Sequence, residues 1–219
     1  MTGAARAYGP EAFRAEFGAT PEQIAKLETY ADLLRKWQKA VNLVAPESLD
    51  AIWHRHFADS AQLVPLIPPD SACLDFGAGA GFPGMVVAIL AAGSGVQVHL
   101  VESNARKCAF LREVARQTGT SVEIHNARVE EIAAGGTVTH VDVVMARGVA
   151  PLARLLKWSE PFFRGSGAIG LFPKGRRADE EIADARKAWT FELRAHPSAT
   201  EPGGKVLEIR ALERLEGRT

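Results

Sequence analysis

The sequence predicts an α/β fold in which a largely parallel sheet, with helices on both faces, follows an N-terminal helical extension. Two observations support this fold class. After about residue 70, apolar runs typical of strands alternate regularly with patterns typical of helices. Before that point the periodicity is helical only, from about residue 20 to residue 64. We therefore divide the chain into a helical extension, residues 1–69, and a core, residues 70–219.

The composition is that of an ordinary globular protein. Of the 219 residues, 47% are hydrophobic and 24% are charged, and the formal net charge is zero. A zero balance argues against free nucleic acid held by bulk charge, but it allows a local basic face. The two cysteines, Cys73 and Cys108, make no disulfide framework and predict buried thiols in a reducing compartment.

The chain shows no pattern of a secreted or membrane protein. Residues 1–16 do not resemble a signal peptide, because they soon carry acidic and basic side chains. The longest apolar run near the glycines, residues 85–92, is too short to span a bilayer. We expect a cytoplasmic protein with no membrane partner, and we expect it to be a monomer.

The extension is expected to contain three helices. A short one lies around residues 11–17. Thr20, Pro21 and Gln23 then form a helix start, with an N-cap, a first-turn proline and a capping box, and this helix should run to about Asn42. The third helix, roughly residues 48–64, is ended by a run of prolines.

The third helix carries a polar quartet, Arg55, His56, Asp59 and Ser60. Residues 55 and 59 are one turn apart, as are residues 56 and 60, so the four side chains share a face. They form either a polar site that looks toward a cofactor or an ordinary intrahelical ion pair, and spacing alone favours the ion pair.

The stretch from Cys73 to Leu90 is the centre of the predicted core. It reads as a buried strand, a glycine-rich turn and an apolar helix, an arrangement whose backbone N–H groups can face a nucleotide-like cofactor. Residues 79–84 fit the dinucleotide pattern G-x-G-x-x-G. Residues 75–81 fit the acid-x-G-x-G-x-G pattern of enzymes that use S-adenosylmethionine (SAM). The two patterns overlap, and this stretch alone does not decide between a dinucleotide and SAM.

The remaining elements follow in alternation. We expect strands at 96–101, 121–125, 141–145 and 168–172, helices at 104–117, 128–133, 151–158 and 178–188, and a closing pair of strands at 191–195 and 205–211. Ligands of such sheets bind beyond the carboxyl ends of the strands. The residues at those ends are Gly77 to Phe82, Glu102, Val129, Glu130, Arg147 and Lys174.

Acidic side chains after successive strands favour SAM over a dinucleotide. Glu102 is placed to accept hydrogen bonds from both ribose hydroxyls of either cofactor. Asp75, inside the first strand, suits the SAM register, and because a buried charge is costly it should contact turn amides or the cofactor's amino group. Glu130 can meet the adenine edge, or it is simply a solvated residue at the head of a short helix. The helical extension before the glycines is a weaker argument for SAM.

The segment after the fourth strand, residues 145–151, narrows the choice of acceptor. It lacks the Asn/Asp-Pro-Pro-aromatic motif of adenine amine methylases, and neither cysteine lies where cytosine C5 methylation needs one. An acceptor with a free lone pair, such as guanine N7, needs no base. Arg147 and Lys174 are candidates for positioning a guanine or a phosphate, although the first could be a strand-end salt bridge and the second a solvated loop cation. No side chain is assigned a catalytic role, and these two are candidates for positioning the substrate only.

Several motifs together resemble the bacterial small-subunit rRNA guanine-N7 methyltransferase family, also called glucose-inhibited division protein B. The resemblance covers roughly residues 34–177, and the Pro-Gly after the glycine turn is especially specific. The motifs are Lys36-Trp37-Gln38-Lys39-Ala40-Val41-Asn42-Leu43, Arg55-His56-Phe57-Ala58-Asp59-Ser60, Gly77 to Gly84, Arg106-Lys107, Phe110-Leu111, Arg128-Val129-Glu130-Glu131, Ala146-Arg147-Gly148, Pro151-Leu152 and Lys174-Gly175.

The resemblance implies a SAM-dependent enzyme with a Rossmann-like class I methyltransferase core behind a helical extension. It implies methylation of N7 of one guanine in 16S rRNA, nucleotide 527, within the small ribosomal subunit. The positions that match the family's SAM contacts are Gly77, Phe82, Val129, Glu130 and Arg147, with Gly79 in the same turn and Glu102 as the ribose acid.

Two other functions stay open at this point, a NAD-linked oxidoreductase and a SAM-binding ribosome factor without activity. A metal site is not expected, because His54 and His56 lie two apart on a helix and the other histidines are scattered. A basic face for RNA is expected from two groups of cations, Arg35, Lys36 and Lys39, and Lys174, Arg176 and Arg177.

Overall fold

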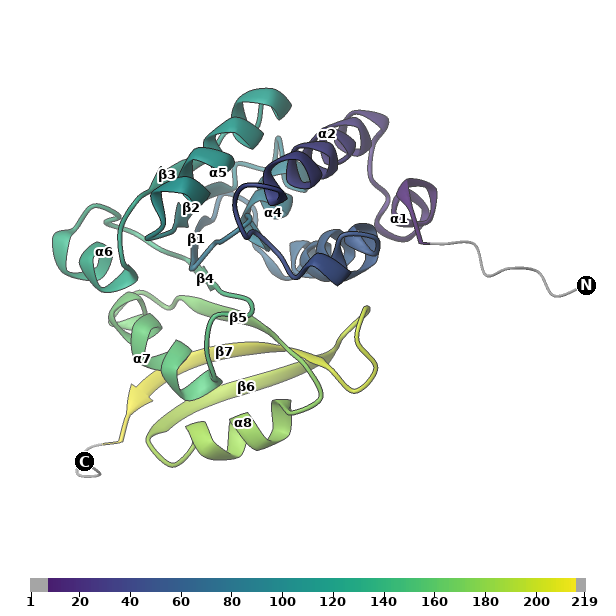
Figure 1. Ribbon diagram of the computed structural model, residues 1–219. Coiled ribbons are helices and arrows are strands. Elements are labelled where there is room, and N and C mark those ends of the chain that lie inside the picture. Colours follow the sequence, from purple (N-terminus) through teal and green to yellow (C-terminus); the bar gives the residue numbers. More distant parts are fainter. Residues whose placement is uncertain (1–7, 216–219) are drawn as a thin grey trace, which may run out of the picture.

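Seven strands form one mixed sheet in the computed structural model, which describes residues 8–215 (Figure 1). The strand order is β3-β2-β1-β4-β5-β7-β6. The first five strands are parallel, and β7 pairs antiparallel with both β5 and β6. The strands are β1 (Ala72–Phe76), β2 (Gln97–Val101), β3 (Glu123–His125), β4 (Val143–Met145), β5 (Ile169–Lys174), β6 (Trp189–Pro197) and β7 (Lys205–Arg214). The predicted α/β fold with a closing strand pair is therefore confirmed.

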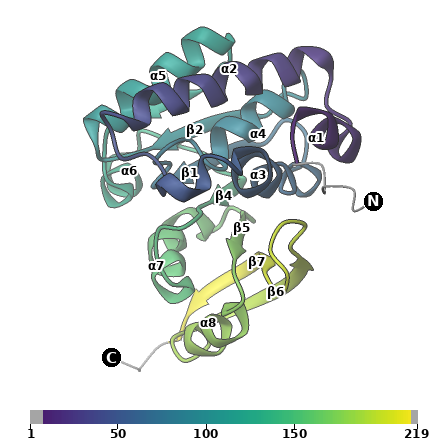
Figure 2. The ribbon, with the colours of Figure 1, turned by 45° about the vertical axis from the view of Figure 1, so that its right-hand side comes forward.

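Helices cover both faces of this sheet. Figures 1 and 2 show α2, α4 and α5 on one side and α6, α7 and α8 on the other. None of the helices within residues 8–215 is long and apolar enough to cross a bilayer. The helices are α1 (Pro10–Phe17), α2 (Pro21–Gln38), α3 (Asp59–Ala61), α4 (Gly84–Leu90), α5 (Ala105–Thr118), α6 (Val129–Gly135), α7 (Leu152–Phe163) and α8 (Ala178–Ala185).

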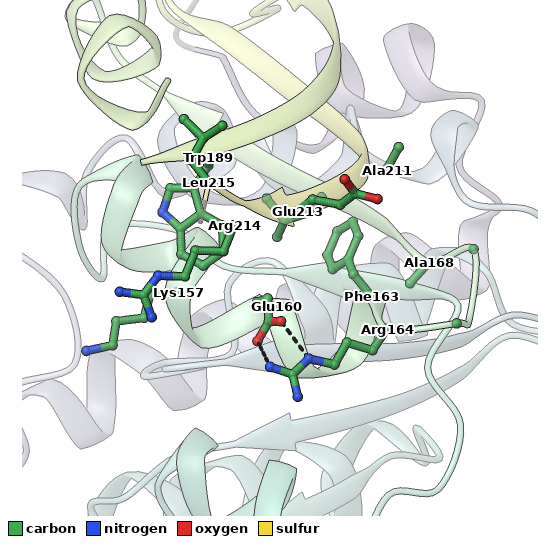
Figure 3. Close-up of a pocket in the computed structure, with 13 residues that line it drawn as sticks. Lys157, Glu160, Phe163, Arg164, Ala168, Trp189, Ala211, Glu213, Arg214 and Leu215 are labelled. Atoms are coloured by element: carbon green, nitrogen blue, oxygen red, sulfur yellow. Dashed lines mark hydrogen bonds and ion pairs between the residues drawn. The ribbon is translucent and has the colours of Figure 1, made fainter. Parts of the chain in front are cut away.

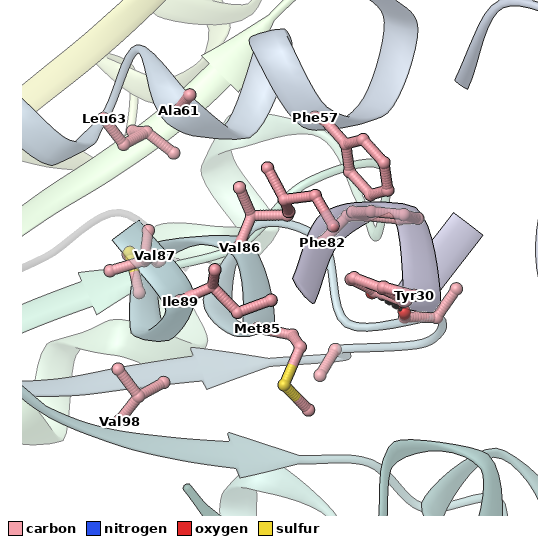
Figure 4. Packing of buried hydrophobic residues seen from close by; sticks show 14 of the residues in the cluster. Tyr30, Phe57, Ala61, Leu63, Phe82, Met85, Val86, Val87, Ile89 and Val98 are labelled. Atoms are coloured by element: carbon pink, nitrogen blue, oxygen red, sulfur yellow. Dashed lines mark hydrogen bonds between the residues drawn. The ribbon is translucent and has the colours of Figure 1, made fainter. Parts of the chain in front are cut away.

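The helical extension packs directly onto the core. Buried side chains of α1 and α2 belong to the same hydrophobic cluster as those of β1, α4 and α5. Figure 4 shows Tyr30 and Phe57 of the extension against Phe82 and Met85. The Tyr30 hydroxyl also donates a hydrogen bond to the carbonyl of Ala80, in the glycine turn. The proposed division between residues 69 and 70 thus separates a helical segment from an α/β segment along the chain, while the two segments share one hydrophobic cluster. Residues 1–7 of the extension lie outside the described part.

The predicted start of α2 is confirmed, but its end comes earlier than expected. The Thr20 hydroxyl accepts from the Gln23 N–H at 3.2 Å, and the Gln23 side chain accepts from the Thr20 N–H at 2.8 Å. The helix stops at Gln38 rather than near Asn42. The Gln38 amide binds the next stretch of chain, since its Oε1 accepts from the N–H groups of Leu43 and Val44 at 3.0 and 3.1 Å. This amide stabilises a turn where helical periodicity alone predicted further helix.

The predicted helix over residues 48–64 is wrong as a continuous element. The segment consists of two 3₁₀ turns, Pro46–Ser48 and Val64–Leu66, with a π-helical stretch Trp53–Ala58 and α3 between them. A π turn holds more residues than an α turn and is often found at functional sites. Side chains one α-turn apart in sequence are therefore not stacked as a regular helix would stack them.

Other boundaries shift by a few residues. The closing strands are longer than expected because they pair with each other over most of their length, with an irregularity between Thr190 and Glu192. Helix α7 continues through Pro161 to Phe163, and α8 ends at Ala185.

Candidate functional site

A groove of about 1220 Å³ lies beyond the carboxyl ends of β1, β2, β4 and β5. Its walls come from three parts of the chain that are distant in sequence. The core contributes the glycine turn and the residues that follow the strands, the extension contributes residues between 43 and 59, and the loop between β6 and β7 contributes Ser198, Thr200 and Glu201. The groove is where ligands of parallel α/β sheets bind.

The glycine turn forms the floor of this groove. Gly77 and Gly79 have φ angles of +67° and +57°, in the left-handed region that glycine adopts without strain. The N–H groups of Gly77 and Ala78 donate to the carbonyl of Val101 at 2.8 and 3.1 Å, which ties the turn to the end of β2. A β-carbon at position 77 would also lie 2.7 Å from a methyl group of Val149, too close for a side chain. Glycine is therefore required there by both conformation and space.

Asp75 lies below the turn and is fully buried. Its Oδ2 accepts from the N–H of Gly84 at 2.8 Å, so the expected contact with a turn amide is present. Its Oδ1 is buried and has no hydrogen-bond partner among the described residues. Burial raises the pKa of this carboxyl to about 7, against the lowering effect of the Gly84 N–H. Asp75 and Leu100 lie so close to the backbone of Gly84 that no side chain fits there, since a β-carbon would lie 2.4 Å from Leu100.

Glu102 follows β2 and lies on the groove wall. One carboxylate oxygen accepts from the N–H of Gly79 at 2.9 Å, and the other accepts from the N–H of Asn104 at 2.7 Å. The side chain is thereby fixed beside the glycine turn, at the position predicted for a ribose acid.

Val129 and Glu130 do not line the groove. Val129 is buried in the hydrophobic cluster beneath α6 and α7. Glu130 accepts a hydrogen bond from the indole N–H of Trp158 at 2.7 Å. The carboxylate expected at the adenine edge is thus bound to a side chain of the neighbouring helix α7.

Arg147 follows β4 and joins the core to the extension. Its Nη1 donates to the Asp59 carboxylate at 2.7 Å and to the Arg55 carbonyl at 2.9 Å, and its Nη2 donates to His56 Nδ1 at 2.9 Å. These three bonds leave two of the five guanidinium N–H groups without a partner among the described residues. Three members of the polar quartet therefore bind Arg147, His56 and Asp59 through their side chains and Arg55 through its carbonyl. The Ser60 hydroxyl instead donates to the carbonyl of His56 at 2.7 Å.

The hydrogen bonds of His56 define its tautomer. Arg147 can only donate, so Nδ1 accepts and Nε2 carries the proton. Nε2 then donates to Ser48 Oγ at 2.8 Å, and the Ser48 hydroxyl donates to the carbonyl of Ala45 at 2.6 Å. Burial, together with the charge of Arg147, lowers the pKa of His56 to about 3. The imidazole is neutral and holds the guanidinium in place.

Phe82 lies at the wall of the groove but is nearly buried, with 4% of the residue's surface exposed. It stacks on His56 with ring centroids 4.8 Å apart and on Tyr30 at 5.4 Å. The Arg147 guanidinium carbon lies 5.1 Å from the ring centroid. Phe82 thus supports the cation that lines the site.

Lys174 lines the groove but is largely buried, with 9% of its side chain exposed. Its ammonium group donates to the Ala150 carbonyl at 2.8 Å and pairs with Glu181 at 2.8 Å. Glu181 also accepts from the N–H of Leu152 at 2.7 Å. The interpretation of Lys174 as a solvated loop cation is therefore wrong, because the residue ties β5 to the start of α7 and to α8.

The predicted basic face is not continuous. Figures 1 and 2 place α2, with Arg35 and Lys36, and α8 at opposite ends of the molecule. Near α8, Arg176 pairs with Glu201 and Arg177 pairs with Glu180, both at 2.8 Å. The cations of the groove wall itself are Arg55, Lys107, Arg147 and Lys174.

Two contacts of the site could not be expected from the sequence. Ser48 orients His56, and Thr200 donates to Asp59 Oδ1 at 2.7 Å. Thr200 is 141 residues from Asp59, so no local pattern links them. A separate cleft of about 960 Å³ lies between α7 and the ends of β6 and β7 (Figure 3). It contains none of the predicted site residues.

Comparison with known proteins identifies relatives along nearly the whole chain. Residues 23–208 match the family described as rRNA small subunit methyltransferase G. The ribosomal RNA small subunit methyltransferase G of Caulobacter vibrioides is 45% identical over 204 residues, which cover 93% of this chain and 92% of the relative. The protein of the same name from Parvibaculum lavamentivorans is 44% identical over 220 residues, covering 100% of this chain and 96% of the relative.

Solved structures share the fold at low sequence identity. The Methanococcus jannaschii fibrillarin pre-rRNA processing protein has a TM-score of 0.54 at 16% identity, covering 70% of this chain and 75% of that one. A branched-chain polyamine synthase from Thermus thermophilus has a TM-score of 0.53 at 16% identity, covering 85% and 63%. The predicted Rossmann-like fold of class I SAM-dependent methyltransferases is confirmed.

Proposed function

This chain belongs to the rRNA small subunit methyltransferase G family, and we propose that it transfers a methyl group from SAM to N7 of one guanine in 16S rRNA. The family membership removes the reason to consider a NAD-linked oxidoreductase. We further propose that the substrate is nucleotide 527 within the small ribosomal subunit, and that the protein acts in the cytoplasm as a monomer.

The proposed SAM site is the part of the groove between the glycine turn and Glu102. The Glu102 carboxylate lies 2.9 Å from the Gly79 N–H, so a ribose bound by this acid would rest against the turn. The positive φ angles of Gly77 and Gly79 keep side chains away from that surface. Phe82, Val129, Glu130 and Arg147 complete the proposed set, although Glu130 would have to leave Trp158 to reach an adenine. SAM supplies an electrophilic methyl group on a sulfonium.

The proposed acceptor requires positioning rather than a base. Guanine N7 carries a free lone pair, so no proton has to leave before the attack. The rate then depends on holding the nucleophile in line with the methyl group at short range. Arg147, at the carboxyl end of β4, has two N–H donors that no residue within 8–215 uses, and a guanidinium can hold guanine O6 or a phosphate. His56 is neutral at physiological pH and does not act as an acid in the proposed reaction.

The observation that carries the proposal is the meeting of Glu102 and Arg147 in one groove with the glycine turn. Glu102 would bind the cofactor and Arg147 would face the acceptor, from the ends of the two strands that flank β1. A ribosome factor that binds SAM without transferring its methyl group would need only Glu102. The Arg147 network, with three hydrogen bonds to the extension, favours an enzyme.

The test is methylation of small ribosomal subunits purified from a strain that lacks the gene. The protein and SAM are added, and the rRNA is then cleaved chemically at N7-methylguanine. A single new cleavage site at nucleotide 527 is the expected result. Glu102→Gln should weaken SAM binding in a titration by about tenfold or more, because a carboxylate that bonds both ribose hydroxyls is lost.

Three results would overturn parts of the proposal. SAM binding without any cleavage would favour the ribosome factor. Cleavage at another guanine would keep the enzyme class and change the target. Methylation of free nucleotides at the same rate would argue against recognition of the subunit.

A further inference from the structure

Two histidines that are far apart in the sequence meet on the sheet, together with a glutamate. His99 lies on β2, and Glu123 and His125 lie on β3. The parallel register pairs His99 with Glu123, and His125 is two residues further along β3. Residues two apart on a strand point to the same face, so the three side chains converge on one side of the sheet. They lie outside the groove.

The separations of their ligand atoms match those of a metal site. His99 Nδ1 is 3.2 Å from His125 Nε2 and 3.4 Å from Glu123 Oε2, and His125 Nε2 is 3.9 Å from Glu123 Oε2. Zinc binds imidazole nitrogen at about 2.0–2.1 Å in a tetrahedral arrangement, which sets neighbouring ligand atoms about 3.3 Å apart. Two of the three separations fall at this value, and a small rotation of the Glu123 side chain shortens the third.

The chemistry of the three groups also suits a metal. Two imidazoles and one carboxylate form a common set of zinc ligands. The two ring nitrogens share one hydrogen in the His–His hydrogen bond. Both lone pairs can face a metal once that hydrogen moves to the other nitrogen of its own ring.

The protein around the site favours ligation over chance proximity. The histidine side chains are 12% and 14% exposed, whereas Glu123 is 67% exposed. The imidazoles are thus held by the sheet, and the carboxylate can close over an ion that enters from solvent. Within residues 8–215, these are the His, Cys, Asp and Glu side chains that come close enough for three to share one ion.

We propose that His99, Glu123 and His125 bind one Zn²⁺ ion, with the fourth position open to water. The ion would clamp the short edge strand β3 to β2. The carbonyl of His125 accepts from the N–H of Glu102 at 3.0 Å. One of the proposed zinc ligands is therefore hydrogen-bonded through its backbone to the proposed ribose acid. The expectation of no metal site rested on how far apart the histidines lie in the sequence. The pairing of β2 with β3 brings His99 and His125 together in the fold.

The test is a Zn²⁺ titration of the untagged, metal-free protein against a chromophoric chelator. Wild-type protein should bind one equivalent. Glu123→Gln keeps size and shape at an exposed position, and it should weaken Zn²⁺ binding by about 10- to 100-fold, the loss seen even when outer partners of metal ligands are removed. His125→Gln should abolish binding at the same concentrations. Zn²⁺ should raise the melting temperature of the wild type more than that of either variant.

His140→Gln is the matched control. His140 pairs with Asp142 at 2.8 Å and is 64% exposed, so it offers an ordinary histidine–carboxylate pair outside the cluster. Its replacement should leave Zn²⁺ binding unchanged. With Co²⁺ in place of Zn²⁺, the wild type should show the visible absorption of a tetrahedral nitrogen and oxygen site, and Glu123→Gln should not.

Two results would overturn the proposal. One is the absence of a one-equivalent Zn²⁺ site in the wild type. The other is equal Zn²⁺ affinity in the wild type and Glu123→Gln, which would place any bound ion elsewhere. If the histidine variants do not fold, Glu123→Gln alone decides the question. All readouts are binding and stability, so they are independent of the proposed methyl transfer.

Discussion

The guanidinium of Arg147 lies 2.7 Å from the carboxylate of Asp59, although the two residues are 88 positions apart. Both side chains are only 16% exposed, so water screens the attraction between the two charges less than it would at the surface. Arg147 comes shortly after the end of β4, and Asp59 begins α3 in the extension. The extension therefore fixes the direction of a cation that belongs to the core.

The first prediction concerns this pair in catalysis. Arg147→Lys keeps the charge but loses the planar fork, and methyl transfer should fall about 100-fold. Asp59→Asn leaves Arg147 in place but weakly held, and the rate should fall about tenfold. Because Asp59 acts through Arg147, the double variant should be no slower than Arg147→Lys alone. Single-turnover kinetics with small subunits measures all three.

Additive losses in the double variant would contradict this account. Asp32→Asn is the control, because Asp32 pairs with Arg35 at 3.0 Å on the surface of α2. Its rate should match that of the wild type.

The second prediction concerns the hydroxyl of Tyr30. Tyr30→Phe removes the donor to the Ala80 carbonyl in a fully buried place. Leaving this carbonyl unpaired should lower the free energy of unfolding by about 1–3 kcal/mol. Tyr8→Phe removes a hydroxyl that donates to Glu16 at the surface, and it should cost less than about 1 kcal/mol. Urea denaturation measures both, and equal losses would show that the buried contact has no special weight.

The third prediction concerns space at the start of α4. Gly84→Ala places a β-carbon 2.4 Å from Leu100 and 2.8 Å from Asp75. Strain in a packed core should lower the free energy of unfolding by about 1–3 kcal/mol. Gly135→Ala is the control, because its nearest neighbour would be the Thr137 hydroxyl at 3.5 Å. That change should be neutral or slightly stabilising in a helix. Wild-type stability of Gly84→Ala would contradict the close approach.

The fourth prediction concerns Asp75 and pH. Burial raises its pKa to about 7, so the folded protein holds a proton that the unfolded chain loses near pH 4. The folded state thus binds more protons between about pH 4 and pH 7, and the free energy of unfolding should fall as pH rises through this interval. Asp75→Asn removes this dependence, so its stability relative to the wild type should increase from about pH 4 to about pH 7 and stay constant above that.

Urea denaturation at several pH values tests the sign. The change should approach about 1.4 kcal/mol per pH unit within the interval. Asp50→Asn, at an exposed position, should keep the wild-type slope. A stability difference between wild type and Asp75→Asn that is constant with pH would mean that Asp75 is charged throughout.

Periodicity and caps predicted most of the fold because they are local signals. The capping box at Thr20 and Gln23 and the glycine turn after β1 are each encoded within a few residues. The segment around His56 was mispredicted because its conformation depends on Ser48 and Arg147, which no helical pattern reveals. The burial of Lys174 could not be predicted for the same reason, since Glu181 is its partner only after α8 folds back on β5. The position of Glu102 at the edge of the sheet could be predicted without knowing any distant contact, because the residue follows β2 directly.

The Thr200–Asp59 hydrogen bond has a consequence for synthesis of the chain. A ribosome releases the polypeptide from its N-terminus, so Asp59 emerges long before Thr200. A nascent chain that stops before the loop between β6 and β7 lacks one wall of the groove and one partner of Asp59. The groove is thus completed only after the loop between β6 and β7 has left the ribosome, so its assembly follows the synthesis of the whole sheet up to β6.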